Sequence, residues 1–219
     1  LDQGFSYTID VTVGFPAREI LRQAKAVQPD LIILGGSTGD EDESVYKKSV
    51  AGTTLQKVAK SAACPVLVVN RPAASFWGGL STIVFGTDFS KTADKAFAYA
   101  MTLAKAMDCE LHVFHALDIT PLQGGRTISQ DEIEQGIREA LRKIRARYET
   151  RLKELKNYSM DAWEGIPYVE IVKYARDKHA DLIVMAHHSR KNVSDDIRLG
   201  GNVEQVIVRA GCPVISINK

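Results

Sequence analysis

Short runs of apolar residues alternate along the chain with longer segments in which apolar residues recur every three or four positions. Uninterrupted short runs are typical of strands buried on both faces of a parallel sheet. They cover residues 32–34, 66–69, 83–85, 111–114, 183–185 and 214–217. The helical periodicity follows Gly52, Ser90, Ser129 and Gly200, and such stripes are more typical of core packing than of a partner site. This alternation predicts an α/β fold.

Several helix ends can be placed from capping residues. Ser90 is expected to be the N-cap of the helix that follows the strand at 83–85, because its hydroxyl can accept a hydrogen bond from a free backbone N–H. Ser129 with Glu132 forms a capping-box pattern, which predicts that a long helix starts there. Pro65 and Pro213 follow helical segments and would end them.

A sequence repeat relates the two ends of the chain. The matching segments are 14–20 with 165–171 and 30–34 with 181–185, both 151 positions apart, then Gly52 with Gly200 and 64–66 with 212–214, both 148 positions apart. A repeat of this kind indicates one structural unit present twice. The second copy also has a front half, with the order strand, helix, strand, helix, that the first copy lacks.

The repeat predicts a division of the chain into an incomplete and a complete domain. Residues 1–72 form the C-terminal half of a first domain, residues 73–80 a linker, and residues 81–219 a complete second domain. Half a domain cannot bury its sheet alone. We therefore expect the first half domain to be completed by missing N-terminal sequence, or to pack against the second repeat and a second subunit of a dimer. The initial Leu1 suggests a proteolysed or truncated product, although removal of a tag would look the same.

Apolar edge strands offer a route for assembly. The last strand of each repeat is apolar and is expected at a sheet edge, where unpaired backbone groups favour pairing with another strand. The two edges could join across a pseudo-twofold axis within the chain, or between chains in a homodimer.

Composition limits the classes of partner. The 28 Lys and Arg residues nearly balance the 27 Asp and Glu residues, so no overall field would attract nucleic acid or an anionic membrane. No apolar run approaches the roughly 20 residues that span a bilayer. Three cysteines, Cys64, Cys109 and Cys212, have neither metal-ligand spacing nor the even number of a disulfide framework. A reducing cytoplasm fits this usage.

Five segments resemble a universal stress protein domain in order and spacing. They are residues 83–90 (IVFGTDFS), 111–116 (LHVFHA), 165–167 (GIP), 181–185 (DLIVM), and Gly200 with 212–214 (CPV). The match covers residues 81–218 almost completely, and residues 5–70 from the third strand of a domain onward. The resemblance implies two tandem doubly wound domains of the adenine nucleotide alpha hydrolase type, the first only partly present. Each complete sheet would have five parallel strands in the order 3-2-1-4-5, and often an adenine nucleotide site.

That site is implied in the second repeat, at the carboxyl ends of the strands, where the strand order reverses. Asp88 could accept hydrogen bonds from ribose hydroxyls or from the adenine amino group. Residues 186–189 (AHHS) replace the family's G-x-x-G loop, but Lys191 and Arg198 contribute to a basic loop, and the last helix begins with free N–H groups. The predicted nucleotide-binding residues are Asp88, Ala116, His188, Ser189, Arg190, Gly200, Gly201 and Asn202.

The first repeat keeps the glycines but departs from the pattern in other ways. Twelve residues separate Gly39 from Gly52 instead of nine, and the acidic run 40–43 would repel phosphate unless Mg²⁺ bridges the charges. The Asp of the first strand is also missing. Its candidate nucleotide-binding residues are Gly36, Gly39, Gly52, Thr53 and Thr54. We expect the second repeat to be the better site.

Alternatives remain for individual residues and for the function. Asp88 could simply cap the following helix, and the adjacent His187 and His188 are poorly arranged for one metal ion. The leading hypothesis is a cytoplasmic stress-response regulator that binds ATP or another adenine nucleotide, with or without Mg²⁺, and acts on an unknown regulatory protein. Turnover beyond a slow ATPase is not expected, because no general base is evident. The alternative is a nucleotide-independent interaction module with degenerate sites.

Overall fold

The computed structural model describes residues 6–35, 48–69, 79–120, 128–187 and 201–218, with the side chains of 48–53 excepted. Strands and helices alternate along these residues, as the apolar pattern predicts. The elements are α1 (Pro16–Val27), β1 (Ile32–Gly35), α2 (Lys48–Ser61), β2 (Val66–Val69), β3 (Thr82–Gly86), α3 (Lys91–Met107), β4 (Glu110–Asp118), α4 (Gln130–Leu152), β5 (Tyr158–Gly165), α5 (Pro167–Asp177), β6 (Leu182–Ala186), α6 (Asn202–Arg209) and β7 (Val214–Ile217).

The strands of the described residues form one sheet in the order β1-β2-β7-β6-β3-β4-β5. Within the second repeat every pairing is parallel. Read from β5 to β7, its strands follow the order 3-2-1-4-5, which confirms the predicted doubly wound topology. β4 continues to Asp118, four residues beyond the apolar run that predicted it.

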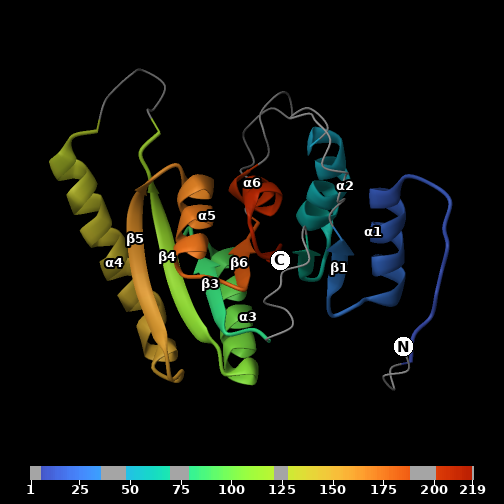
Figure 1. Cartoon of the computed structure of the whole chain (residues 1–219), viewed down its shortest axis with the longest axis horizontal. Helices are drawn as coiled ribbons and strands as arrows, with labels where there is room; N and C mark the ends of the chain where they lie inside the picture. The colour runs from blue at the N-terminus through green and yellow to red at the C-terminus, as the bar shows by residue number, and fades with distance from the viewer. Residues whose placement is uncertain (1–5, 36–47, 70–78, 121–127, 188–200, 219) are drawn as a thin grey trace.

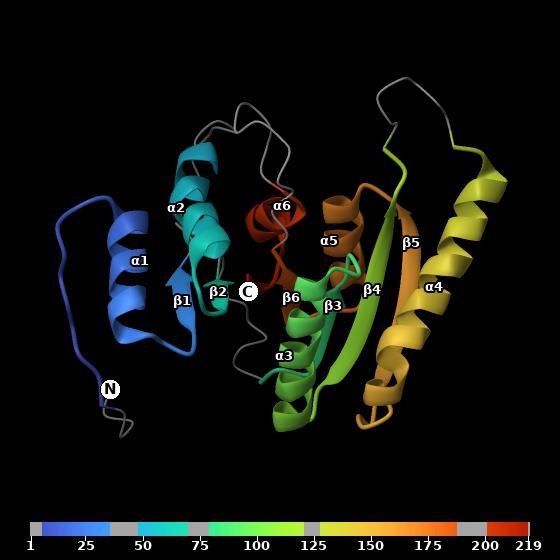
Figure 2. The same ribbon diagram turned by 180° about the vertical axis from the view of Figure 1, so that it is seen from behind.

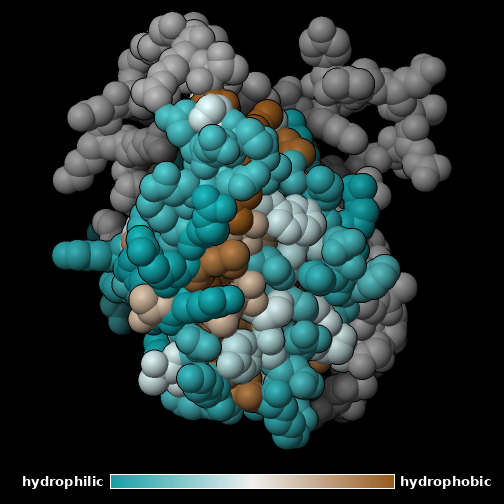
Figure 3. Space-filling model, turned by 90° about the vertical axis from the view of Figure 1, so that its left-hand side faces the viewer, coloured by the Kyte–Doolittle hydropathy of each residue, from teal (hydrophilic) through white to brown (hydrophobic). Residues whose placement is uncertain are grey.

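Helices cover the two faces of this sheet in different groups. α5 and α6 lie on one face, whereas α3 and α4 lie on the other, as the two opposite views show (Figures 1 and 2). On the α3–α4 face, Phe85, Phe97, Ile144 and Tyr148 belong to one buried cluster. Figure 3 shows that the side formed by α4 and β5 is mostly hydrophilic with a narrow apolar band. α4 therefore buries its apolar stripe and exposes its charged face.

The predicted caps are present. The Ser90 hydroxyl accepts a hydrogen bond of 3.1 Å from the Ala93 amide at the start of α3. Ser129 and Glu132 form a complete capping box at the start of α4. α3 ends at Met107, which is 50% exposed, and its C-cap residue Asp108 has a left-handed conformation.

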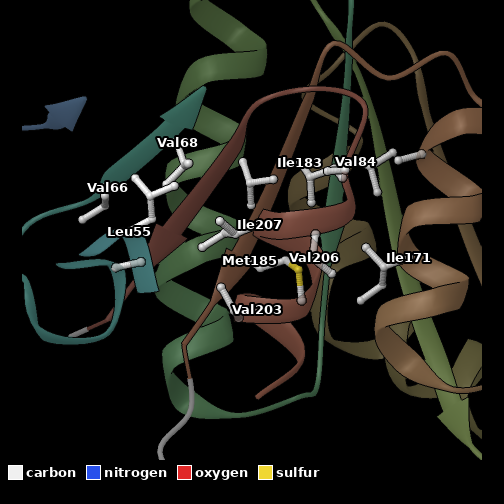
Figure 4. Packing of buried hydrophobic residues seen from close by; sticks show 14 of the residues in the cluster. Leu55, Val66, Val68, Val84, Ile171, Ile183, Met185, Val203, Val206 and Ile207 are labelled. Atoms are coloured by element: carbon white, nitrogen blue, oxygen red, sulfur yellow. The ribbon is translucent and has the colours of Figure 1, made fainter. Parts of the chain in front are cut away.

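The two repeats are joined through their last strands. β2 pairs with β7 in antiparallel fashion, with Leu67 opposite Ile215. The core on the α5–α6 face is continuous across this junction, where Val66 and Val68 lie in the same cluster as Val206 and Ile207 (Figure 4). The predicted pairing of apolar edge strands thus occurs within the chain.

The start of the first repeat differs from the expected third strand. Residues 6–13 form no strand, although their counterpart β5 pairs with β4. They run along the outer side of α1, away from the sheet (Figure 1). Alternate apolar residues there are exposed, with Val11 at 91% and Val13 at 99%. A strand requires a partner, and no described strand lies beside these residues.

Among the described residues, no helix combines the length and apolar character that crossing a membrane requires.

Candidate functional site

The candidate site lies where the strand order reverses between β3 and β6. These strands are parallel neighbours, with Phe85 opposite Val184. β3 leads into α3 on one face of the sheet, whereas β6 precedes α6 on the other (Figures 1 and 2). In open α/β sheets this divergence leaves a crevice at the carboxyl ends of the strands, which is where ligands bind.

Asp88 lies in the turn that leaves β3 and is exposed. Its Oδ1 accepts a hydrogen bond of 2.9 Å from the Ser90 amide. Ser90, and not Asp88, is the residue that caps α3. Within the described part of the chain no hydrogen bond involves Asp88 Oδ2. One oxygen therefore stabilises the turn, and the other can accept a hydrogen bond from a ligand.

Ala116 lies near the end of β4, beyond the end of β3. The ladder between these strands ends at Gly86 and Phe114, and the Thr87 amide donates to the Phe114 carbonyl at 2.9 Å. β4 continues along β5, where Ala116 is opposite Trp163. Backbone groups of alternate residues point to the same side of a strand. The N–H and C=O of Ala116 therefore point past the end of β3, beside the Asp88 turn.

A histidine of β4 is hydrogen-bonded to the turn that contains Asp88. His115 Nδ1 lies 2.7 Å from the Thr87 carbonyl oxygen, so Nδ1 carries the proton and donates it. Burial lowers the pKa of His115, more than the hydrogen bond to Thr87 and the nearby Asp88 charge raise it. A neutral imidazole with this tautomer is therefore expected at neutral pH.

The end of the site nearest α6 contains a buried polar pair. His187 directly follows β6, and its Nε2 lies 3.0 Å from Oε1 of Glu204 in the first turn of α6. Both side chains are more than nine-tenths buried. Burial raises the pKa of Glu204, but hydrogen bonds from His187 and from its own amide, with the charges of His187 and Lys60, lower it overall. Glu204 is therefore ionised at neutral pH, although its Oε2 has no partner among the described residues.

The structure describes four of the sequence-predicted residues of the second repeat. Gly201 is the N-cap of α6 and Asn202 its first residue, so free N–H groups are present at this end of the site. Asp88 and Ala116 lie at the other end. The remaining predicted residues of the second repeat, His188, Ser189, Arg190 and Gly200, lie outside the described residues.

The first-repeat candidates are placed differently. Gly52, Thr53 and Thr54 lie inside α2, which begins at Lys48, whereas the counterpart helix α6 begins two residues after Gly200. Amides beyond the first turn are bonded within the helix, so Gly52 does not offer the free N–H group that Gly201 and Asn202 can. Gly36 and Gly39 lie outside the described residues.

Comparison with known proteins identifies the family of this chain. A family model described as the universal stress protein family matches residues 2–70 and 79–218. The chain belongs to the universal stress protein family. It is 31% identical to universal stress protein MJ0531 of Methanocaldococcus jannaschii over 142 residues, which are 63% of this chain and 81% of the relative.

Longer solved structures share the fold of this universal stress protein. One from Archaeoglobus fulgidus has a TM-score of 0.66 at 22% identity, and covers 93% of this chain. A structure described as a putative universal stress protein from Pseudomonas aeruginosa UCBPP-PA14 has a TM-score of 0.67 at 21% identity, and covers 94% of this chain. This chain spans 65% and 69% of those two chains, respectively.

Two features of the site could not be found from the sequence. The buried pair of His187 and Glu204 joins the end of β6 to the start of α6. Neither residue belongs to a sequence motif that would indicate the pairing. The contacts of His115 and Arg147 with the Asp88 turn join residues that are 28 and 58 positions apart.

No group of three or more His, Cys, Asp or Glu residues suited to a metal ion occurs in the described part of the chain.

Proposed function

We propose that the second repeat of this universal stress protein binds an adenine nucleotide in the crevice between β3 and β6. The observation that carries the proposal is the placement of two kinds of group around the end of β3. Asp88 presents a carboxylate with one oxygen not engaged in the turn, and Ala116 presents backbone groups past the end of the β3 ladder.

The chemistry of these groups suits an adenosine. Adenine presents an amino donor beside ring-nitrogen acceptors, which complements a backbone C=O and N–H pair such as that of Ala116. The carboxylate of Asp88 is an acceptor for ribose hydroxyls or for the adenine amino group. We assign the base and ribose to this end of the crevice.

The phosphates would then extend toward α6. Free amides at Gly201 and Asn202 lie at the positive end of the helix dipole. Arg190 and Lys191 would add positive charge from the segment of the sequence that precedes α6, and a Mg²⁺ ion could accompany a triphosphate. The first repeat is the weaker candidate, because α2 begins before Gly52.

The bound nucleotide would act as a signal rather than as a substrate. The carboxylate of Glu204, in the first turn of α6, is buried and hydrogen-bonded to His187, so it is poorly placed to activate a water molecule. At most a slow ATPase is expected. In this proposal the protein is a cytoplasmic stress-response regulator whose nucleotide-bound form contacts a regulatory protein.

Calorimetric titration with ATP, with and without Mg²⁺, tests the proposal, together with extraction of nucleotide from the purified protein. Saturable binding near one site per chain is expected. Asp88→Ala should weaken binding by about tenfold or more, because a hydrogen bond to a charged group contributes about 1.5–3 kcal/mol. Asp108→Ala is the matched control, since this exposed carboxylate lies at the far end of α3.

A double variant examines the phosphate end. Replacing Arg190 and Lys191 by Ala should weaken ATP binding while leaving adenosine binding unchanged. Unchanged ATP affinity would remove the phosphate site from the proposal. Release of phosphate above the buffer rate at high protein concentration would contradict binding without turnover.

One observation favours a second candidate function, a nucleotide-independent interaction module. Glu204 places a buried carboxylate in the first turn of α6, and it competes with a phosphate for that positive helix end. The absence of ATP binding and of extracted nucleotide would support this second candidate and overturn the first.

A further inference from the structure

The turn that carries Asp88 contains a strained residue. Phe89 has a φ of 60°, in the left-handed region, which is unfavourable for a bulky L-residue. Such a conformation persists only where the surrounding structure fixes it. Because Phe89 directly follows Asp88, the contacts that hold Phe89 also determine where the Asp88 carboxylate points.

Arg147 of α4 lies across this turn. Its Nη1 donates to the Phe89 carbonyl at 2.6 Å, and its Nη2 donates more weakly to the Ser90 carbonyl at 3.4 Å. Nε and Nη2 of the same guanidinium bond the two carboxylate oxygens of Asp94, at 2.7 and 2.5 Å. Only a planar group with several fixed donors can make all these bonds at once.

Asp94 completes the arrangement at the start of α3. Its hydrogen bond with Arg147 lowers its pKa, and this effect exceeds the opposite effect of burial. The carboxylate is therefore ionised at neutral pH and holds the guanidinium in the plane that reaches the turn. Arg147 thus links the first turn of α3 to the carbonyl groups that follow Asp88.

Neighbouring contacts hold the rest of the turn. Thr87 Oγ1 accepts a hydrogen bond of 3.0 Å from the Phe89 amide and lies 3.0 Å from the hydroxyl of Tyr148. The Phe89 ring packs against the His115 ring, with centroids 4.5 Å apart. The Phe89 side chain is thereby directed toward α4 and β4, and the preceding Asp88 is left exposed.

The geometry points to Arg147 as a positioning residue for the nucleotide site, one that sets the direction of the Asp88 carboxylate through the backbone of Phe89 and Ser90. This inference rests on the proposed function for its consequence, ligand affinity, but not for the positioning itself. Arg147 acts here through the turn, and its guanidinium is already engaged by Asp94. It therefore differs from an arginine that contacts a phosphate directly.

Amide hydrogen exchange on the ligand-free protein tests the positioning. Arg147→Gln should speed exchange of the Phe89 and Ser90 amides by about tenfold or more, because the turn loses its carbonyl contacts. Arg151→Gln is the matched control, since Arg151 lies one turn further along α4, with its guanidinium 5.1 Å from the centroid of the Phe97 ring. Arg147→Lys, which keeps the charge but not the planar fork, should resemble Arg147→Gln. Unchanged exchange in Arg147→Gln, or full recovery in Arg147→Lys, would overturn the inference.

A double-mutant cycle on adenine nucleotide binding tests the consequence. Arg147→Gln should weaken ATP binding by about tenfold when Asp88 is present and have little effect in an Asp88→Ala background. An equal loss in both backgrounds would mean that Arg147 contacts the nucleotide itself, and would overturn the inference. If the wild-type protein binds no nucleotide, the proposed function fails, and the exchange of the turn amides still decides the positioning.

A variant is also needed in case Arg147→Gln does not fold. Asp94→Asn weakens the hold on the guanidinium while leaving Arg147 in place, and should speed exchange of the same two amides. Normal exchange in a folded Asp94→Asn protein would count against the arrangement described here.

Discussion

The side-chain amide of Asn218, directly after β7, donates a hydrogen bond of 2.6 Å to the carbonyl oxygen of Ala59 in α2. The same nitrogen donates to the Ala62 carbonyl at 2.9 Å. The last carbonyls of a helix have no partner within the helix. Asn218 of the second repeat therefore caps the C-terminal end of α2 in the first repeat. This contact reinforces the antiparallel junction of β2 and β7.

Replacing Asn218 by Asp therefore provides a test of the junction between the repeats. Aspartate has nearly the same shape, but it removes both donors and turns a negative charge toward two carbonyl oxygens. We expect the free energy of unfolding to fall by about 2–3 kcal/mol, as measured by urea denaturation. Thr102→Ala, which removes an exposed bond within α3, should change it by less than about 0.5 kcal/mol. An equal effect of both variants would contradict this role of Asn218.

The pair of His187 and Glu204 predicts an acid-dependent loss of stability. The pKa of Glu204 in the folded protein lies below its ordinary value of 4.5. The pair therefore stabilises the fold above about pH 4.5, and that contribution is lost as the pH falls through the lowered pKa. The free energy of unfolding of the wild-type protein should decrease as the pH is lowered from 6 to 3. The decrease should be less steep for Glu204→Gln. Parallel profiles for the two proteins would contradict the assignment.

His187→Leu should be more harmful than Glu204→Gln. Removing the imidazole leaves a buried carboxylate without its side-chain partner, which costs about 3–5 kcal/mol. The side-chain amide introduced by Glu204→Gln would still accept a hydrogen bond from His187 through its oxygen. Thermal unfolding at pH 7 measures the order of the two variants, and the exposed Glu164→Gln provides a control. The reverse order would mean that His187 is not the principal partner of Glu204.

Two glycines in matched positions should differ in their effect on stability. Gly14 and Gly165 have φ values of 149° and 143°, and an added Cβ would lie 2.9 and 2.6 Å from the Cγ of Glu19 and Glu170, respectively. Gly165→Ala should lower the free energy of unfolding by about 1–3 kcal/mol, because Gly165 ends a strand of the sheet. Gly14→Ala should cost less, because residues 6–13 belong to no strand. Equal losses in chemical denaturation would contradict this distinction.

The Cys212 thiol should be unreactive in the folded protein. Burial, with a smaller effect of the Asp181 charge, raises the pKa of Cys212 to about 12. Only the thiolate reacts with alkylating reagents. Labelling with iodoacetamide at pH 8, followed by peptide mass spectrometry, should be at least about a hundredfold slower in the native protein than in urea. Similar rates in both conditions would show that Cys212 is not protected by the fold.

Part of the candidate site could be predicted from the sequence because its residues follow strands that are themselves predictable. Asp88 and Ala116 lie three and two residues beyond the apolar runs at 83–85 and 111–114, and the resemblance to the family assigned both of them to the site. The contacts of Arg147 could not be predicted. They depend on how α4 packs across α3, and periodicity identifies the buried face of a helix without specifying its neighbour.

The sequence by itself determined the alternation of strands and helices, because local apolar patterns record which residues are buried, and it determined the presence of a repeat. The order of the parallel strands in the second repeat was implied by the resemblance of five short segments to the family. Only the tertiary structure decided how the two repeats meet. An apolar edge strand can pair with any other edge, and the choice of β2 with β7 depends on the fit of α2 over β7, where Asn218 reaches the end of the helix. The tertiary structure also decided the conformation of residues 6–13. These residues have the alternating apolar pattern of a strand but form no strand, because a strand is stable only beside a partner.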